Sequence, residues 1–401
     1  LRPYQEELIV GARQHFRAGR KRVLLQLATG GGKTAICARM LHNAASRGKR
    51  VWFCVHRREL VNQVAKALKS EGVEYGLVTA DAKMNLSAPA QVCSIPTLAN
   101  RLERVPPPDL IAWDECHHIA ARSYAAIMAR YPDAYHLGLT ATPVRLDGAG
   151  LANYFGAMVC GPSVKWLIQE GFLSRYRLFA PMTIDRDSLP KRMGEYVTSA
   201  AAQMITPKIV GDAISHYRKH CDGARGVTFS VSVEKSKETA ALFNAAGIPA
   251  LHIDGKTESG LRDAMMDDFQ AGKVLMLCNV GLFSEGFDCP ALEVVIDTAP
   301  TMSMGNYRQR VGRMLRPSPG KEYGIYLDCV GNSHMHGLPD DDIQWQLTTG
   351  RAEKKKNEVP SPRVCGYCFG ASRAGSRVCR VCGEAFPVEA REVEQVDGEL
   401  E

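Results

Sequence analysis

The chain has 401 residues with 45% apolar side chains, a length that predicts two or three domains with ample cores. The sequence shows neither an apolar run of membrane-spanning length nor a signal peptide at its start, so we expect a cytoplasmic protein rather than a membrane protein. The formal net charge of +7 is modest, but basic residues cluster at 47–58, 308–316 and 354–356. Such clusters suit a polyanionic partner, although each alone is also typical of a solvated surface.

The first predicted elements flank a phosphate-binding loop. An apolar strand is expected at 23–27 and a helix after residue 33, with Ala28-Thr-Gly-Gly-Gly-Lys33-Thr34 between them. Glycines let such a backbone curl so that its N–H groups point at phosphate oxygens, while the lysine reaches the β- and γ-phosphates and the threonine hydroxyl can ligate Mg²⁺. Leu27 stands where the general pattern has glycine, which favours the helicase variant; a ligand-free glycine-rich turn is the alternative. The predicted nucleotide-binding residues are Thr29, Gly30, Gly31, Gly32, Lys33 and Thr34.

A pair of carboxylates follows a later apolar strand. The run 110–113 predicts a strand that delivers Asp114 and Glu115 to its carboxyl end, where parallel sheets place their ligands. Asp114 is suited to hold Mg²⁺, and Glu115 to orient and deprotonate an attacking water. His117 and His118 then lie close enough to sense the site. An acidic pair alone would more simply cap a helix, but together with the loop it predicts hydrolysis of a nucleoside triphosphate.

Short apolar strands alternate with helical patterns in two series, which predicts an α/β fold with two tandem parallel-sheet domains. The first series has strands at 51–55, 91–95, 110–113 and 136–139, and the second at 226–230, 250–253, 274–277, 294–296 and 324–328. We therefore expect a first, ATP-binding domain at 1–160, a linker at 161–205, a second domain at 206–347 and another linker at 348–362. A cysteine module at 363–386 and an acidic tail at 387–401 follow.

Four of the thirteen cysteines form a metal-binding pattern. The spacing of two C-x₂-C pairs separated by ten residues is typical of a structural Cys₄ zinc site with no open coordination position. A redox dithiol is the alternative, but neither pair opens a helix in a βαβ unit. Arginines and aromatics around the pairs either contact nucleic acid or only coat the module. The predicted zinc ligands are Cys365, Cys368, Cys379 and Cys382.

The complete motif series resembles the helicases of superfamily 2, from their DEAD/DEAH-related branch. The motifs are Arg2-Pro-Tyr-Gln5, the phosphate loop, the segment 56–63, Ser94-Ile-Pro-Thr97, Asp114-Glu-Cys-His117, Thr140-Ala-Thr142, Thr228-Phe-Ser230, the segment 279–290 and Gln309-Arg-Val-Gly-Arg313-Met-Leu-Arg316. The resemblance covers residues 1–345 and implies two RecA-like domains with ATP and Mg²⁺ between them. The stretches at 317–321 and 327–332 and the downstream cysteines resemble most closely the bacterial RadD family of DNA-repair ATPases.

The resemblance also implies roles for individual residues. Gln5 would read the adenine edge with help from Arg2, while His117, Thr140 and Thr142 would couple hydrolysis to the second domain. Nucleic-acid phosphates would be held by Arg58, Thr97, Ser230 and Ser284, which read the backbone rather than the bases. Across the cleft, the resemblance implies roles for Gly286, Asp288, Gln309, Arg313 and Arg316 around the triphosphate.

These expectations combine into an ATP-dependent helicase or translocase, bacterial or phage-encoded. The resemblance favours DNA, single-stranded or branched, over RNA, and suggests a repair or single-strand-binding protein as a partner. A nucleic-acid-stimulated ATPase that remodels complexes without separating strands is one alternative. The motor subunit of a restriction system is another, but the sequence carries no nuclease constellation, so this reading requires a partner chain.

Overall fold

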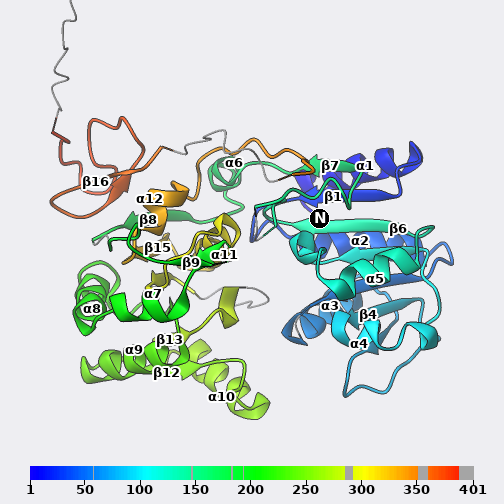
Figure 1. Cartoon of the computed structure of the whole chain (residues 1–401), viewed down its shortest axis with the longest axis horizontal. Coiled ribbons are helices and arrows are strands. Elements are labelled where there is room, and N and C mark those ends of the chain that lie inside the picture. Colours follow the sequence, from blue (N-terminus) through cyan, green and yellow to red (C-terminus); the bar gives the residue numbers. More distant parts are fainter. Residues whose placement is uncertain are drawn as a thin grey trace, which may run out of the picture.

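The computed structural model describes residues 1–56, 58–145, 148–181, 184–192, 194–284, 292–350 and 360–387, without the side chains of Arg58, Glu59, Ser259 and Ser284. Within these ranges the chain folds into two domains that lie side by side, each built on a parallel sheet, with the cysteine module against the second (Figure 1). The predicted α/β fold with two tandem parallel sheets is confirmed. No helix in the described ranges has the length and apolar character needed to cross a membrane.

The first domain is a seven-stranded parallel sheet with helices on both faces. In spatial order its strands are β3 (Tyr75–Val78), β4 (Ala90–Ser94), β2 (Val51–Val55), β5 (Leu110–Trp113), β6 (Tyr135–Thr140), β1 (Arg22–Gln26) and β7 (Ala157–Cys160). Its helices are α1 (Pro3–Arg17), α2 (Lys33–Ala45), α3 (Arg58–Ser70), α4 (Ile95–Ala99) and α5 (Arg122–Arg130), with single turns η1 (Leu102–Arg104) and η2 (Cys116–His118). Every residue of β2 is buried, as expected for a parallel strand covered on both faces, which explains its uninterrupted apolar sequence.

The second domain is a six-stranded parallel sheet whose edge strand comes from the predicted linker. In spatial order its strands are β12 (Ala250–Ile253), β13 (Met276–Asn279), β11 (Gly226–Phe229), β14 (Val294–Asp297), β15 (Tyr323–Asp328) and β8 (Arg175–Phe179). Its helices are α7 (Thr198–Met204), α8 (Pro207–Cys221), α9 (Val233–Ala245), α10 (Ser259–Gln270), α11 (Met304–Met314) and α12 (Asn332–His336), with the turn η3 (Leu282–Ser284). The segment 161–205 thus does more than connect two domains: it carries α6 (Val164–Gln169), β8 and the hairpin of β9 (Lys191–Arg192) and β10 (Glu195–Tyr196).

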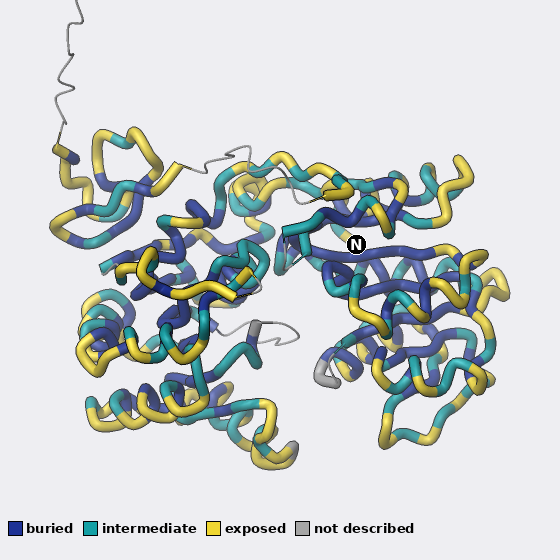
Figure 2. The backbone as a smooth tube through the Cα atoms, in the orientation of Figure 1, coloured by how far each residue is buried: buried dark blue, intermediate teal, exposed yellow. Residues whose placement is uncertain are grey.

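Figure 2 shows buried backbone along both sheets and exposed backbone on the outer helical turns. The fully buried side chains include Trp52 and Trp113 in the first domain and Tyr307 and Tyr326 in the second. Each large apolar side chain of this kind stabilises the fold by about 1.5–3 kcal/mol relative to its exposure to water. The sheets are therefore rigid platforms whose carboxyl ends can position reactive side chains.

A buried histidine makes the first domain sensitive to acid. His136 is completely buried; its Nδ1 accepts a hydrogen bond from Trp113 Nε1 at 3.1 Å, and its Nε2 lies 3.0 Å from the carbonyl of Tyr131. Burial lowers the pKa of His136 to about 4. Because the unfolded chain binds the proton near pH 6.5 and the folded chain does not, this group favours unfolding as the pH falls from about 6.5 to 4.

We therefore expect the free energy of unfolding to fall by up to about 3 kcal/mol over that pH interval through His136. Urea titrations at several pH values would give the free energy of unfolding of the wild type and of His136→Gln. The slope of this free energy against pH should be smaller for the variant, because glutamine removes the titrating group. Equal slopes for the two proteins would contradict the assignment.

Candidate active site between the two domains

The predicted phosphate loop follows β1 and leads into α2. Gly30 and Gly32 have left-handed backbones, with φ of 84° and 89°. A Cβ on Gly31 would lie 2.7 Å from Leu27 Cγ, so the leucine fills the space beneath the loop where the general pattern has glycine. The departure at Leu27 is thus accommodated by glycine at position 31, and the loop retains the curled backbone that suits phosphate.

The amino-terminal motif braces this loop from outside. Gln5 Nε2 and the Tyr4 hydroxyl both donate hydrogen bonds to the carbonyl of Gly31, at 2.9 and 2.8 Å. The backbone N–H of Arg2 donates to Gln5 Oε1 at 2.9 Å, so each polar atom of this carboxamide is engaged once and keeps one further hydrogen-bonding position. A Cβ on Gly32 would lie 2.3 Å from Gln5 Nε2, so glycine is required there for this close packing.

An aromatic cluster beside the loop was missed by sequence reasoning. The rings of Tyr4, Trp166 and Phe172 lie 5.2–5.9 Å apart, and the guanidinium of Arg2 lies 4.9 Å from the Phe172 ring centre. Trp166 and Phe172 fall in the predicted linker. A signal was nevertheless present, because Ser163 is a helix N-cap whose hydroxyl accepts a hydrogen bond from the N–H of Trp166 at 3.2 Å.

The catalytic candidates of the first domain converge next to the loop. Lys33 Nζ lies 3.6 Å from Glu115 Oε1, and His117 Nδ1 lies 3.3 Å from Glu115 Oε2. Asp114 is buried at the end of β5; burial, together with the charge of Glu115, raises the pKa of Asp114 to about 6. Glu115 adopts a left-handed backbone with φ of 42°, a strained state for a non-glycine residue. In this conformation the carboxylate lies next to both the lysine and the histidine.

A hydrogen-bonded chain continues from this site toward the second domain. The Thr140 hydroxyl donates to the carbonyl of Thr142 at 3.0 Å and lies 3.2 Å from His117 Nδ1. The same Nδ1 lies 3.3 Å from Glu115 Oε2, so His117 connects the carboxylate to Thr140. Thr142 in turn reaches α11 of the second domain, where a Cβ on Gly305 would lie 3.1 Å from Thr142 Oγ1. The three predicted coupling residues therefore form one continuous path.

Helix α11 presents the last predicted motif to the phosphate loop. A Cβ on Gly312 would lie 2.5 Å from Thr29 Cβ, so the helix and the loop are in direct contact. Arg316 Cγ would lie 3.6 Å from a Cβ on Gly30. Arg313 and Gln309 are buried, and neither polar atom of the Gln309 carboxamide has a hydrogen-bond partner among the described residues. The structure thus brings residues of both domains to one site.

The candidates for nucleic-acid contact are only partly defined. Thr97 is half-buried on α4. Ser230 is buried after β11, and its hydroxyl has no hydrogen-bond partner in the described part of the chain. The side chains of Arg58 and Ser284, and the residues Gly286 and Asp288, lie outside the described residues.

The four predicted zinc ligands form a compact cluster. Their sulfur atoms all lie within 4.8 Å of one another, with Sγ–Sγ distances of 3.7 Å for Cys365 and Cys382 and 3.6 Å for Cys368 and Cys379. A tetrahedral ion with metal–sulfur bonds of about 2.3 Å requires about 3.8 Å between sulfurs, so the cluster fits zinc. Backbone N–H groups of Gly370 and Val381 point at Cys368 and Cys379 sulfurs, at 3.3 and 3.4 Å.

The cysteine module is docked on the second domain. Its strands β16 (Arg363–Val364) and β17 (Ala371–Ser372) lie near β8, where the N–H of Ala180 donates to the carbonyl of Phe369 at 2.9 Å. Arg380 donates to the hydroxyl and carbonyl of Tyr176, and Arg373 pairs with Asp340 at 2.8 Å. Arg373 and Arg380, two of the arginines near the cysteine pairs for which a nucleic-acid contact was one alternative, therefore hold the module in place. Tyr367, by contrast, is 76% exposed.

Comparison with known proteins extends this picture. Residues 1–145 match the family described as "Type III restriction enzyme, res subunit", and residues 209–318 match "Helicase conserved C-terminal domain". A 51.5 kDa protein of a Lactococcus phage is 33% identical over 381 residues, which cover 94% of this chain and 81% of that protein. A protein of Saccharomyces cerevisiae named "Putative ATP-dependent helicase IRC3" is 26% identical over 87% of this chain and 55% of its own length. A subunit of the type I restriction enzyme EcoAI of Escherichia coli is 29% identical over 84% of this chain and 48% of its own length.

Solved structures share the fold. A fragment of an HsdR-type subunit of a type I restriction enzyme from Vibrio vulnificus YJ016 has a TM-score of 0.66 at 23% identity, covering 84% of this chain and 65% of that chain. Dbp5 of S. cerevisiae has a TM-score of 0.56 at 14% identity, covering 82% of this chain and 87% of its own. With the RecA-like architecture, the restriction-enzyme and helicase family matches and the site between the domains, the chain belongs to superfamily 2 of the helicases, whose members hydrolyse ATP, and is related to the HsdR and Irc3 proteins.

Proposed function

We propose that this protein is an ATP-driven DNA translocase or helicase of the RadD type that acts in DNA repair or recombination in the bacterial cytoplasm. The observation that carries the proposal is the contact of α11 with the phosphate loop, where Gly312 meets Thr29 and the following Arg316 comes close to Gly30. A site completed by two domains changes when the domains move, so hydrolysis there is suited to drive movement along a strand.

Each residue of the site has a specific role in this proposal. The loop N–H groups and Lys33 bind the phosphates of ATP, and Glu115, oriented by His117, accepts the proton of the attacking water. Thr34 and Asp114 would hold Mg²⁺, which neutralises phosphate charge when bound; the high pKa of Asp114 fits a carboxylate that needs a cation beside it. Arg313 and Arg316 would stabilise charge that develops in the transition state, and Gln309 would assist them.

Binding of the nucleotide base would involve the bracing residues of the loop. Gln5 has one free position on each carboxamide atom for the adenine edge, and Arg2 and the neighbouring Phe172 lie next to it. Gly286 and Asp288 would line the same cleft. His117, Thr140 and Thr142 would report the state of Glu115 to α11, because their contacts run from one to the other.

The nucleic acid would cross both domains. Arg58 and Thr97 would hold its phosphates on the first domain, and Ser230 and Ser284 on the second, without reading sequence. The restriction-enzyme relatives favour DNA, since one solved relative of this fold, the LlaBIII enzyme, is bound to DNA. Dbp5, solved with RNA, shares less sequence with this chain than the restriction subunits do. A single-strand-binding or other repair protein is the expected protein partner.

Nucleic-acid stimulation of ATP hydrolysis tests the proposal. We expect single-stranded or forked DNA to raise the ATPase rate more than RNA does, with affinity that falls steeply as salt rises and varies little with base sequence. ATPase rates measured in parallel with single-stranded, duplex and forked DNA and with RNA, each at several salt concentrations, provide the data. A salt-insensitive affinity for one particular sequence would rule out a backbone-tracking motor.

The relatives favour one second candidate, the motor subunit of a restriction system, because the first family match and the EcoAI subunit belong to such enzymes. A strand-displacement assay on forked DNA separates the candidates. Displacement by the isolated chain supports a helicase, whereas ATP-dependent translocation without displacement supports a restriction motor or a remodelling ATPase.

We also propose that the cysteine module holds one structural zinc ion. Elemental analysis should find about one zinc per chain, and Cys379→Ser should release it, because one missing thiolate opens the tetrahedral site. Cys160→Ser, which changes an exposed cysteine outside the cluster, is the matched control and should retain the metal. Zinc-free protein with four intact thiols would refute the site.

A further inference from the structure

The segment 338–350 crosses from the second domain to the first along one side of the molecule (Figure 1). It follows α12, and its burial alternates along an extended chain. Asp341, Ile343, Trp345 and Leu347 are half-buried, whereas the residues between them are exposed. Such an alternation indicates that one face of the segment is packed against the protein along its length.

The start of the segment is fixed to the second domain and to the cysteine module. Leu338 is buried, and the carbonyl of Asp341 accepts a hydrogen bond from the Arg308 guanidinium at 3.3 Å. Asp340 is bonded to the Tyr176 hydroxyl. From the module, Arg373 pairs with Asp340 at 2.8 Å and with Asp341 at 3.4 Å. Helix α11, strand β8 and the cysteine module therefore all contact the segment at these two aspartates.

The end of the segment is fixed to the first domain by backbone pairing. The N–H of Gly150 donates to the carbonyl of Gly350, and the N–H of Ala152 donates to the carbonyl of Thr348, both at 2.9 Å. A Cβ on Gly150 would lie 2.2 Å from that Thr348 carbonyl oxygen, so the approach requires glycine. Leu347 packs against the core of the first domain. The segment is therefore attached at both ends, to different domains.

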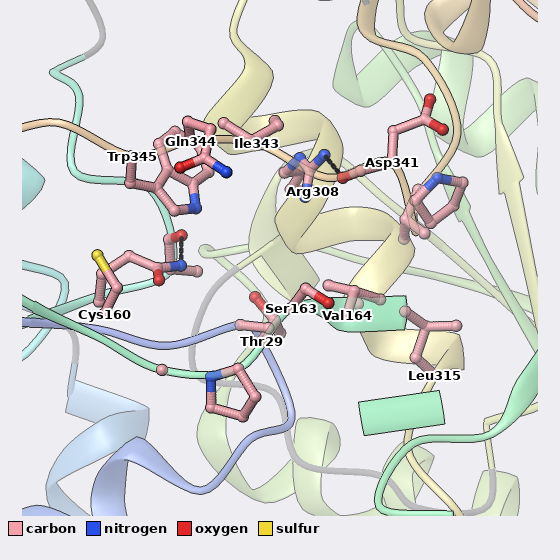
Figure 3. A pocket seen from close by; sticks show the side chains of 18 residues that line it. Thr29, Cys160, Ser163, Val164, Arg308, Leu315, Asp341, Ile343, Gln344 and Trp345 are labelled. Carbon is pink, nitrogen blue, oxygen red and sulfur yellow. Dashed lines mark hydrogen bonds between the residues drawn. The ribbon is translucent and has the colours of Figure 1, made fainter. Parts of the chain in front are cut away.

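Between its two attachments the segment faces the back of α11. The Trp345 ring lies 6.0 Å from the guanidinium carbon of Arg308, a cation–π distance (Figure 3). Together they border a cavity of about 240 Å³ that also reaches Thr29 and Gly312. Arg308 and Gly312 lie one turn apart on α11 and Leu315 is the residue at its end, and all three line this cavity. Arg313, proposed to act on the phosphates, is buried in the same helix, and Arg316 follows its end.

We propose that residues 338–350 form an interdomain strap that limits opening of the cleft and holds α11 against the phosphate loop, and that the cysteine module secures the strap through Arg373. A tether fixed to both domains keeps their facing surfaces at high effective concentration even without nucleotide. The consequence for ATP affinity rests on the proposed function, but the restraint on the domains does not. The module thereby gains a mechanical connection to the ATP site.

Single-molecule energy transfer between the domains tests the strap without ATP. Dyes would be attached through non-natural amino acids at the exposed positions Lys66 on α3 and Lys237 on α9, since the chain contains thirteen cysteines. We expect a narrow distance distribution for the wild type and a broader, longer one for Trp345→Ala. Trp345→Phe, which retains a ring, should restore the distribution, and Gln346→Ala, which changes the exposed neighbour, should leave it unchanged.

The same variants give a kinetic readout. With weaker restraint, Trp345→Ala should raise the KM for ATP about five-fold while kcat changes less, because saturating ATP closes the cleft again. Arg373→Ala should act in the same direction, and Arg377→Ala, which changes another exposed arginine of the module, is its matched control.

Unchanged distances for Trp345→Ala, in protein with an unchanged melting temperature, would overturn the strap. A longer distance for Trp345→Ala but not for Arg373→Ala would overturn the role of the module alone. A wild type with the expected narrow distance distribution but no DNA-stimulated ATPase would instead count against the proposed function.

Discussion

Replacing Glu115 by glutamine is expected to lower the turnover of ATP by about 10²–10⁴-fold, because the amide cannot accept the proton of the attacking water. Glutamine has nearly the same shape, so the surroundings of Lys33 and His117 should be retained and ATP should still bind. Lys33→Ala, by contrast, should lose both turnover and ATP affinity, since the proposed role of the ammonium group is to contact the phosphates themselves.

Steady-state ATPase rates and equilibrium binding of a fluorescent ATP analogue would separate the two variants. Glu103→Gln is the matched control, because Glu103 is an exposed carboxylate whose ion pair with Arg130 lies on the surface of the first domain. Wild-type turnover in Glu115→Gln would show that another group is the base.

The second large effect is expected at the arginines of α11 and of the turn that follows it. Arg313→Ala and Arg316→Ala should each lower kcat by about 10³-fold or more, as expected for guanidinium groups that stabilise a phosphoryl transition state. Affinity for DNA should remain, because neither residue is among those proposed to bind the strand. Arg313→Lys should recover little, since an ammonium group lacks the planar fork of the guanidinium.

Arg310 in the same helix provides the contrast. Its NH1 lies 3.0 and 3.1 Å from the two carboxylate oxygens of Asp297, which is completely buried and also accepts hydrogen bonds from Tyr326 and Asn332. Arg310→Ala should therefore destabilise the second domain by about 3–5 kcal/mol, because it leaves a buried charge without its partner. Thermal melts alongside ATPase and DNA-binding assays would distinguish a chemical role from a structural one. If Arg313→Ala mainly lost DNA binding, α11 would be a strand-binding surface instead.

Sequence reasoning found the parts of the site in which local pattern and chemistry coincide. The glycines, lysine and threonine at 30–34 are adjacent in the chain, and Asp114 and Glu115 follow an apolar run that must become a buried strand. The four cysteines are equally evident, because their spacing determines the knuckle geometry. In each case the residues of the motif lie close together in the chain, so each motif can be recognised without knowledge of distant contacts.

Sequence by itself thus determined the class of fold, the phosphate loop, the acidic pair and the cysteine cluster. The tertiary structure alone decided what joins them. It assigned β8 in the expected linker to the edge of the second sheet, gathered Tyr4, Trp166 and Phe172 beside the loop, and paired Arg310 with the buried Asp297. It also placed the segment 338–350 across both domains. The physical reason is the range of these contacts. Strand pairing, ring packing and polar side-chain contacts join residues from about ten to more than 200 positions apart in the chain. Helical or strand periodicity, in contrast, reports only which face of an element is buried.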